Sequence, residues 1–336
     1  MTSTERALQV VEIGLDDGYA WTKVALPSGQ LLAVPSRACV GTAGITSAFD
    51  GAPLVHEYET LGRRYSVGPV DAESTRFDDY PYSNLNRVIV QHALQAAELD
   101  GAVVNVVSGL PVSTFFLPDG SRRDELIARK VGNLLQEVVP CDGRLAATIA
   151  RHSVIPEALA AWYDFVIIEG GNGPEVAEER VRYPVAVIDI GGRTTDFVVV
   201  QDRAILHRSS GSLRCGMLDL TERVRGALSA RFGLEVIGDR IVDDALKAGA
   251  VRLFSIGHDV SALVDTARGE LVETLRDEAR RHLGRGAELE QVLFVGGGAV
   301  ALAEQTSQWF PNQHVAPMPA FANARGMLKF QRYVGL

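Results

Sequence analysis

Two stretches that lie far apart in the chain share one pattern. Residues 10–26 (VVEIGLDDGYAWTKVAL) and 185–200 (VAVIDIGGRTTDFVVV) each read as an apolar strand, an acidic residue, a glycine-containing turn and a second apolar strand. This pattern predicts a β-hairpin whose tip can wrap backbone N–H groups around a phosphate, because glycine lets the main chain approach closely. A chain that builds this tip twice is expected to grip one polyphosphate from two sides.

Length and composition narrow the class of protein. A chain of 336 residues is long enough for two domains of about 150 residues each. Its composition, with 46% hydrophobic and 22% charged residues, is typical of a globular protein. The formal charge of −9 argues against a broad surface for nucleic acid or acidic membrane, so a link to DNA would run through a second protein. The three cysteines are scattered, which is typical of reduced side chains. The sequence has no apolar run near the ~20 residues of a membrane span and no secretion signal, so we expect a soluble cytoplasmic protein.

Strands and helices alternate along the rest of the chain. Strand patterns cover 30–34, a hairpin at 58–67, 102–107, 145–152, 204–208 and 292–295, with a loop at 211–216. Helical spacing covers 85–99, 124–135, 156–161, 218–228, 241–249, 260–283, 300–307 and 320–333. Proline 156 is expected in the first turn of its helix. The repeated order predicts an α/β sandwich of two similar halves with a cleft between them, each half carrying an insertion.

The two hairpin tips carry the residues with chemistry. Asp16, Asp17 and Gly18 form the first tip, and Lys23 follows on the return strand. The second tip holds Asp189, Gly191, Gly192, Thr194, Thr195 and Asp196. Carboxylates repel a polyphosphate unless a divalent cation lies between them, and Mg²⁺ is the usual ion. The alternative is a pair of plain hairpins with Asp-Gly turns, which the matching positions disfavour.

Two further features are weaker signals. Glu157, at a helix start, could orient or deprotonate a water, or could only be an acid favoured by the helix dipole. Gly296, Gly297 and Gly298 at a strand end could border a ribose or a flat ring, or form a simple turn.

The ordered motifs resemble the actin-like ATPase superfamily. LDDGYAWTK is similar to its first phosphate loop, IPEALAA to its connecting helix, DIGGRTTD to its second phosphate loop and VGGGA to its adenosine loop. SGLP and the terminal FANARGM strengthen the resemblance to the plasmid-segregation ParM (StbA) family and its archaeal actin-like relatives. This implies an actin-like (ribonuclease H-like) duplicated α/β fold with a nucleotide cleft between two domains. Domain I would span 1–180 with an insertion at about 40–85, domain II 181–318 with a helical insertion at about 216–288, and a helix at 319–336 would return to domain I.

The resemblance also implies roles for individual residues. Asp16 and Asp189 would hold Mg²⁺, through water, on ATP, and Glu157 would place the attacking water. Contacts to the nucleotide would come from Asp17, Gly18, Tyr19, Lys23, Gly191, Gly192, Arg193, Thr194, Asp196, Gly296, Gly297 and Gly298. Tyr19 and Arg193 depart from the smaller residues usual in relatives, and Arg193 could touch a phosphate or point to solvent.

The expected function is an ATPase that polymerises into dynamic filaments and moves plasmid DNA through a ParR-like DNA-binding adaptor, with no direct contact to nucleic acid or membrane. One alternative is a small-molecule kinase of the same superfold. Another is a chromosomal cytoskeletal or cell-division actin tethered to membrane by a weakly amphipathic tail at 327–336. Residues 327–336 are expected instead to be a closing core helix.

Overall fold

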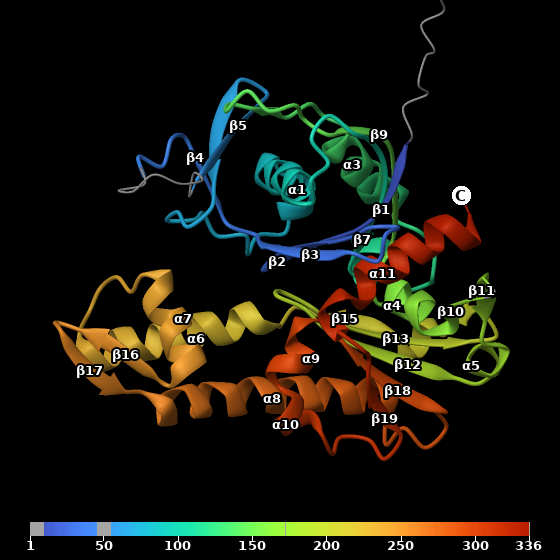
Figure 1. Cartoon of the computed structure of the whole chain (residues 1–336). Helices are drawn as coiled ribbons and strands as arrows, with labels where there is room; N and C mark the ends of the chain where they lie inside the picture. Colours follow the sequence, from blue (N-terminus) through green and yellow to red (C-terminus); the bar gives the residue numbers. More distant parts are fainter. Residues whose placement is uncertain (1–9, 46–54, 172, 336) are drawn as a thin grey trace, which may run out of the picture. The chain divides into compact units, whose positions relative to one another are not determined.

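The computed structural model describes residues 10–45, 55–171 and 173–335, which form two compact units (Figure 1). Unit 1 takes in the described residues of Met1–Glu178 and Phe321–Leu336, and unit 2 is Glu179–Ala320. The chain passes from one unit to the other within α5 (Glu178–Arg182). Each unit is built on its own β-sheet and has its own apolar core.

The main sheet of unit 1 has five strands in the order β3-β2-β1-β7-β9. Their bounds are β1 Val11–Asp17, β2 Trp21–Ala25, β3 Leu31–Pro35, β7 Val103–Leu110 and β9 Thr148–Pro156. The first three strands are antiparallel neighbours, whereas β1, β7 and β9 run parallel. Ile13, Leu15 and Val106 are buried in the core of this sheet, as strands covered on both faces require.

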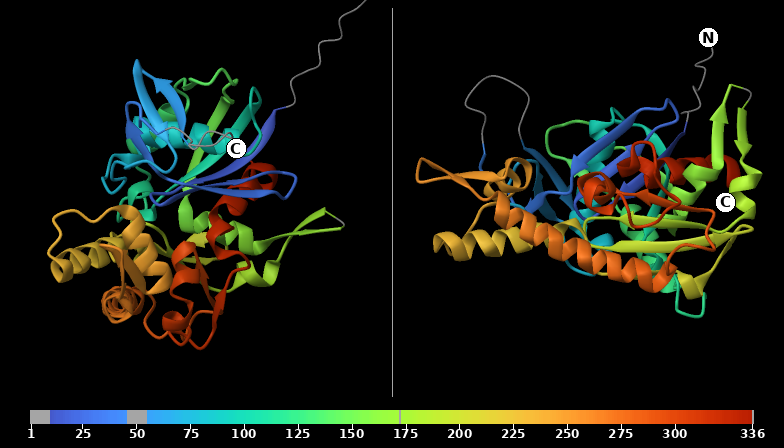
Figure 2. Two further views of the ribbon diagram at one scale, coloured as in Figure 1. Left: turned by 60° about the vertical axis from the view of Figure 1, so that its left-hand side comes forward. Right: turned by 90° about the horizontal axis from the view of Figure 1, so that it is seen from below.

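A second, four-stranded sheet in unit 1 has the order β4-β6-β5-β8. It comprises β4 Ala38–Val40, β5 His56–Thr60, β6 Arg63–Val67 and β8 Val139–Pro140. Helix α1 (Asn84–Ala96) packs against strands of both sheets, and α3 (Asp124–Leu134) packs on β9. A two-stranded hairpin of β10 (Ile167–Gly170) and β11 (Gly173–Val176) stands apart from these sheets (Figure 2).

The C-terminal helix α11 (Ala322–Lys329) packs on α4 (Glu157–Val166) and on β1, and a π-helical turn (Phe330–Val334) follows it. The backbones meet closely at two glycines: a Cβ on Gly326 would overlap the carbonyl of Ala160, and one on Gly14 would overlap the carbonyl of Ala324. Arg325 also pairs with Asp164, with Nε 3.0 Å from Oδ2. Small residues and an ion pair therefore fix the last helix inside unit 1.

The sheet of unit 2 repeats the arrangement of unit 1. Its order is β14-β13-β12-β18-β19, and β15 also pairs with β13. The strands are β12 Val185–Ile190, β13 Thr195–Gln201, β14 Ala204–Ile205, β15 Gly211–Leu213, β18 Gln291–Val295 and β19 Gln313–Val315. As in unit 1, a central strand carries an antiparallel hairpin on one side and two parallel strands on the other. The duplication expected from the two hairpins is confirmed.

Helices and a small hairpin complete unit 2. The long helices are α6 Met217–Phe232, α7 Asp239–Ala248 and α8 Ser261–Leu283, and the short ones are α9 Gly297–Ala301 and α10 Ala303–Thr306. Strands β16 (Ala250–Leu253) and β17 (Ile256–Asp259) form a hairpin between α7 and α8. Across the described ranges, no helix is both long and apolar enough to span a bilayer.

Several expected elements are wrong in detail. Pro156 is the last residue of β9, so the helix begins at Glu157 and proline lies outside its first turn. The expected strand at 204–208 ends at residue 205, and the expected loop at 211–216 contains β15, because both segments pair with the edge of β13. The helix expected at 300–307 is two short helices that begin at Gly297. The block expected to be helical also contains the β16–β17 hairpin.

Candidate functional site

The first hairpin tip connects β1 and β2 in unit 1. Asp16 lies opposite Lys23 in the strand register, and Lys23 Nζ donates to Asp16 Oδ2 at 2.8 Å. Successive side chains of a strand point to opposite faces, so Asp16 and Asp17 face different ways. Asp16 and Lys23 together therefore form one charged pair beside the tip.

Asp17 takes part in a different network. Its carboxylate forms an ion pair with Lys130 of α3, whose side chain is only 1% exposed, and accepts a hydrogen bond from Asn86 Nδ2 at 2.8 Å. Burial raises the pKa of Asp17, and Lys130 and Asn86 oppose that rise. These two contacts hold the Asp17 side chain inside unit 1, and its expected contact to the nucleotide stays a prediction. Lys130 was not singled out in the sequence, where the only signal is a lysine beside the apolar stripe of its helix.

Hydrogen bonds and a ring contact connect the turn residues of the first tip to the rest of unit 1. The carbonyl of Gly18 accepts from Ser36 Oγ at 2.7 Å, and the carbonyl of Tyr19 accepts from Thr75 Oγ1 at 2.6 Å. The Tyr19 ring lies on Tyr80, with ring centroids 5.0 Å apart. These contacts fix the course of the backbone, so this tip offers a ligand a preformed loop.

The second hairpin tip lies in unit 2 against the start of α6. The carbonyls of Gly191 and Gly192 accept from the backbone N–H groups of Met217 (3.0 Å) and Leu218 (2.7 Å). A Cβ on Gly216 would come within 2.6–2.7 Å of the same two carbonyl oxygens, so this close approach requires glycine. The turn is closed by a hydrogen bond of 2.9 Å from Gly191 N–H to the carbonyl of Thr194.

This packing sets the direction of the loop's amide groups. In a trans peptide the N–H points opposite to the carbonyl of the same peptide unit, and all described peptide bonds are trans. Because the carbonyls of residues 191 and 192 point to α6, the N–H groups of Gly192 and Arg193 point away from it. Successive amides aimed in one direction are the usual donors of an anion-binding loop.

Two acidic residues of unit 2 face each other next to this loop. Asp189 on β12 is directly opposite Asp196 on β13, both are buried, and their carboxylate oxygens lie within 4.8 Å of each other. Ser212 Oγ donates to Asp196. Like charges opposite each other destabilise a sheet, and a divalent cation bound through oxygen ligands removes that penalty. The two aspartates thus fit a Mg²⁺ site.

The three glycines that follow β18 pack directly against the residues of β12. A Cβ on Gly296, whose φ is +85°, would overlap Asp189 Oδ1, and a Cβ on Gly298 would overlap the side chain of Ile190. Because β12 and β18 are parallel neighbours, their carboxyl ends meet at one edge of the sheet. The second phosphate-type loop, Asp189 and Gly296–Gly298 therefore belong to one local site in unit 2.

Glu157 lies at the corresponding edge of the sheet in unit 1. It is the first residue of α4 and is half-buried. A Cβ on Gly109, near the end of β7, would come within 2.5 Å of Glu157 Cγ and 2.6 Å of Met327 Cε. Gly109 thus makes room for the glutamate side chain and for Met327 of the C-terminal helix.

Comparison with known proteins agrees with this geometry. Residues 12–166 match the family described as plasmid segregation protein ParM, N-terminal, and residues 187–308 match the archaeal actin homologue MreB-like family, C-terminal. With its duplicated two-domain α/β fold, the chain is a member of the actin-like superfamily.

Within that superfamily its similarity is to ParM proteins and archaeal actins. Archaeal actin homologs from Thermoplasma volcanium and Thermoplasma acidophilum are 25% and 26% identical, over 94% of this chain and 97% of each relative. A crystal structure of an archaeal actin homolog in complex with ADP aligns with a TM-score of 0.73 at 20% identity, over 95% of this chain and 98% of that one. A 15-stranded ParM filament from Clostridium botulinum aligns with a TM-score of 0.76 at 18% identity, over 96% and 99%. At these identities the structural likeness establishes the fold.

Proposed function

We propose that this chain is a cytoplasmic ATPase that polymerises into nucleotide-dependent filaments. The observation that carries the proposal is the buried Asp189–Asp196 pair beside a loop whose amides point outward, in a fold that repeats the hairpin device in each unit. A paired carboxylate site next to amide donors suits a cation bound to a polyphosphate. The similar structures of an ADP complex and of a ParM filament support nucleotide binding and self-assembly.

In this proposal both units contact one nucleotide. Asp16 and Asp189 hold Mg²⁺ through water, and the bound ion neutralises phosphate charge. Phosphate contacts come from the backbone of Asp17, Gly18 and Tyr19, from Lys23, and from Gly191, Gly192, Arg193 and Thr194 of the second loop. Asp196, opposite Asp189, contacts the nucleotide through the bound cation. Gly296, Gly297 and Gly298 border the nucleoside.

Glu157 is the proposed catalytic group for hydrolysis. A carboxylate at the start of α4 can orient the attacking water or accept its proton, and positioning is the main contribution that a protein makes to phosphoryl transfer. The absence of a side chain at Gly109 leaves the space that the Glu157 side chain occupies, which supports a fixed place for the carboxylate. A nucleotide can control assembly only if it binds the assembling conformation more tightly than the other conformation. Loss of the γ-phosphate would then weaken the conformation that assembles.

The biological task that we propose is plasmid DNA segregation, in which a DNA-binding adaptor of ParR type links filament and plasmid. The match to the plasmid segregation family supports this role. The net charge of −9 suits a protein that reaches DNA through a partner.

Sedimentation of the purified chain with Mg²⁺ tests the proposal. The protein should pellet with ATP or a non-hydrolysable analogue, and should stay in the supernatant with ADP or after addition of EDTA. Transfer of phosphate to an added sugar or to acetate, without any pellet, would show a small-molecule kinase instead.

A further inference from the structure

The first hairpin tip is held by a segment that lies more than 50 residues further along the chain. Thr75 Oγ1 donates a hydrogen bond of 2.6 Å to the carbonyl of Tyr19, across 56 positions of the sequence. The ring of Tyr19 lies on that of Tyr80, with ring centroids 5.0 Å apart. Thr75 is 7% exposed and Tyr80 is completely buried. We call residues 75–80 the tip clamp.

The tip clamp is itself fixed by hydrogen bonds and ring packing. Within it, the N–H of Phe77 donates to the carbonyl of Thr75 at 2.9 Å, and the N–H of Tyr80 donates to the carbonyl of Phe77 at 3.1 Å. The rings of Phe77 and Tyr80 meet edge to face, with centroids 6.0 Å apart. Just before the clamp, the N–H of Glu73 donates to the carbonyl of Ala38, the first residue of β4, at 2.9 Å. The clamp can therefore hold the tip in one place.

Two consecutive carbonyls of the tip are bound by hydroxyl groups of this region. The carbonyl of Gly18 accepts from Ser36 Oγ at 2.7 Å, and the carbonyl of Tyr19 accepts from Thr75 Oγ1. In a trans peptide the N–H points opposite to the carbonyl of the same peptide unit, and all described peptide bonds are trans. The N–H groups of Tyr19 and Ala20 therefore point away from the two hydroxyls.

The two units thus use different groups to aim the amides of their tips. In unit 2, backbone N–H groups at the start of α6 bind two consecutive loop carbonyls. In unit 1, the hydroxyls of two buried side chains, Ser36 and Thr75, bind them. Consecutive amides that point in one direction are the usual donors to an anion. Because a hydroxyl can be removed by a single substitution, the arrangement in unit 1 can be tested directly.

We propose that Ser36 and the tip clamp are positioning groups for the first tip, and that they aim the N–H of Ala20, together with that of Tyr19, at a phosphate of the nucleotide. The ring contact between Tyr19 and Tyr80 gives the clamp a second hold on the tip. This inference rests on the proposed nucleotide binding. It adds to the proposed site one backbone donor and the side chains that orient it.

Thr75→Val tests the clamp in the full-length chain, because valine has nearly the shape of threonine and lacks the hydroxyl. The dissociation constant for ATP in the presence of Mg²⁺, measured by calorimetric titration, should rise about tenfold or more, since the carbonyl of Tyr19 loses its partner. Thr75→Ser keeps the donor and should bind ATP as the unmodified chain does.

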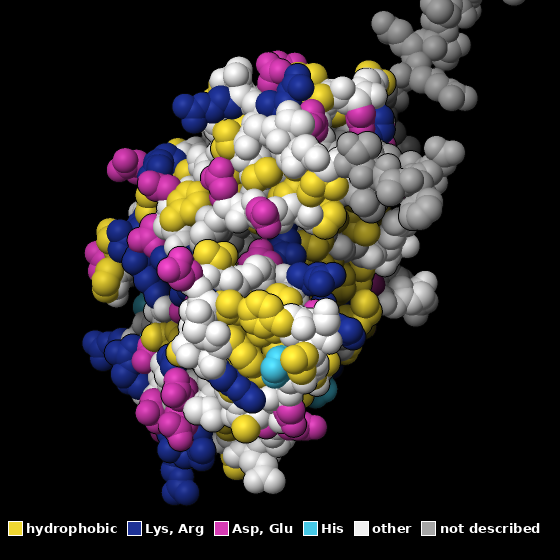
Figure 3. Space-filling view, turned by 90° about the vertical axis from the view of Figure 1, so that its left-hand side faces the viewer, with side chains coloured by type: hydrophobic (Ala, Val, Ile, Leu, Met, Phe, Trp, Pro, Cys, Tyr) yellow, Lys and Arg dark blue, Asp and Glu magenta, His cyan; other side chains and the backbone are white. Residues whose placement is uncertain are grey.

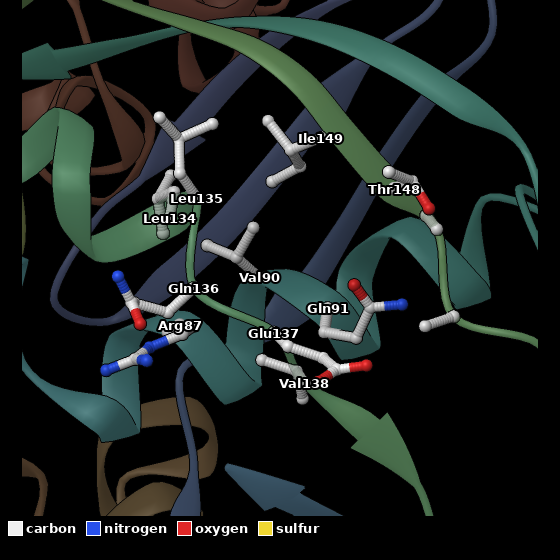
Figure 4. Close-up of a pocket in the computed structure, with 12 residues that line it drawn as sticks. Arg87, Val90, Gln91, Leu134, Leu135, Gln136, Glu137, Val138, Thr148 and Ile149 are labelled. Carbon is white, nitrogen blue, oxygen red and sulfur yellow. The ribbon is translucent and has the colours of Figure 1, made fainter. Parts of the chain in front are cut away.

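Thr60 offers a matched control in the same unit. It is 3% exposed, and its Oγ1 donates to the carbonyl of Glu137 at 2.7 Å. Glu137 lies in the wall of a surface cavity of about 260 Å³, and no described residue of the first tip lines that cavity (Figure 4). Arg87 Nη1 also donates to Thr60 Oγ1, at 3.2 Å. Thr60→Val should therefore lower the melting temperature at least as much as Thr75→Val and leave the dissociation constant for ATP unchanged.

The ring contact is tested separately. Tyr19→Ser removes the ring and keeps the backbone, and it should weaken ATP binding about two- to tenfold, the usual effect of losing an aromatic pair. Tyr19→Phe keeps the ring and should leave the affinity unchanged. Phe254→Asn is the control for an aromatic side chain elsewhere. Phe254 is 79% exposed at the end of the β16–β17 hairpin of unit 2, and Figure 3 shows the face that carries this hairpin in Figure 1.

The amide of Ala20 can be observed by NMR in protein labelled with ¹⁵N-alanine. Its signal is the one that Ala20→Ser removes, and it should shift when Mg²⁺ and ADP are added. In Thr75→Val the same signal should shift less at equal concentrations of ADP. A signal that stays in place in the unmodified protein, under conditions where ADP binds, would remove Ala20 from the site.

The remaining outcomes separate this inference from the proposed function. Equal ATP affinities of Thr75→Val and the unmodified chain would overturn the positioning role of the clamp. An equal loss of affinity in Thr60→Val would also overturn it, because the loss would then follow from reduced stability alone. If the unmodified chain does not bind ATP in the presence of Mg²⁺, the proposed function fails together with this inference.

Discussion

Asp189 and Asp196 face each other across β12 and β13, and both carboxylates are buried. Without a cation the two negative charges repel each other and lower the free energy of unfolding of the unit, and ion binding relieves this repulsion. In the proposed site, binding of a metal–nucleotide would therefore stabilise unit 2.

Asp189→Asn should separate these two effects. The neutral amide removes the repulsion, so the melting temperature of the nucleotide-free protein should stay level or rise. The affinity for ATP in the presence of Mg²⁺ should fall about 10–100-fold, a common loss when a metal site is impaired. Calorimetric titration with and without Mg²⁺ measures it, and an unchanged affinity would remove Asp189 from the site.

Glu157→Gln should slow hydrolysis by about 10²–10⁴-fold, the usual contribution of a general acid or base, while ATP-dependent assembly persists. Phosphate release and pelleting measure the two effects in one sample. Glu125→Gln is the control, because Glu125 is also an acid in the first turn of a helix, α3, and interacts with the helix dipole. This variant should not change the rate of hydrolysis. Filaments of Glu157→Gln that turn over normally would contradict the assignment.

Gly216→Ala should disturb the second loop. Its Cβ would lie 2.6–2.7 Å from the carbonyl oxygens of Gly192 and Gly191, so the loop must move, and ATP affinity should fall at least tenfold. Gly226→Ala, inside the helix α6 that follows Gly216, is the control. No heavy atom lies within 4 Å of that Cβ, and alanine should stabilise the helix by about 0.5–1 kcal/mol without a change in ATP affinity. Equal affinities for Gly216→Ala and Gly226→Ala would show that the contact does not shape the loop.

The local motifs predicted the two hairpins and the glycine turns at the strand ends, because each of these features depends on residues close in sequence. The ion pair between Asp17 and Lys130 could not be predicted this way, since it joins the end of β1 to a helix over 100 residues later. The β16–β17 hairpin escaped detection for a different reason: its turn is Phe254-Ser255, which lacks the Asn-Gly or Asp-Gly signal. Gly296 lies against Asp189 because β18 is the neighbour of β12 in the sheet. The order of strands in a sheet could be predicted only from the resemblance to the actin-like family.

Lys130→Met should destabilise unit 1 by about 3–5 kcal/mol, because it leaves the buried Asp17 carboxylate without its cation. The double variant Asp17→Leu/Lys130→Met should recover much of that loss, since apolar replacement of a whole buried pair is often neutral. Urea unfolding measures the free energy of both proteins. If the double variant is no more stable than the single one, the pair does not account for the loss.

His152 should make stability depend on pH. It is buried, its Nε2 lies 2.8 Å from Ser108 Oγ, and burial together with the nearby Lys130 lowers the pKa of His152 to about 3. The unfolded chain binds a proton near pH 6.5 and the folded chain does not, so stability is complete above that pH. Below it, stability falls by up to ~1.4 kcal/mol per pH unit toward pH 3.

Urea unfolding between pH 7 and pH 5 measures this slope. His152→Gln should flatten it, whereas His314→Gln, at an exposed position, should leave it as it is. An identical slope in His152→Gln would show that other groups cause the dependence.

Light scattering recorded together with phosphate release tests the central claim most directly. With Mg²⁺ and ATP, scattering should rise first and then decay as phosphate appears, and with a non-hydrolysable analogue it should rise and remain. Phosphate release without any rise in scattering, at protein concentrations well above micromolar, would contradict the account of this chain as a polymerising ATPase.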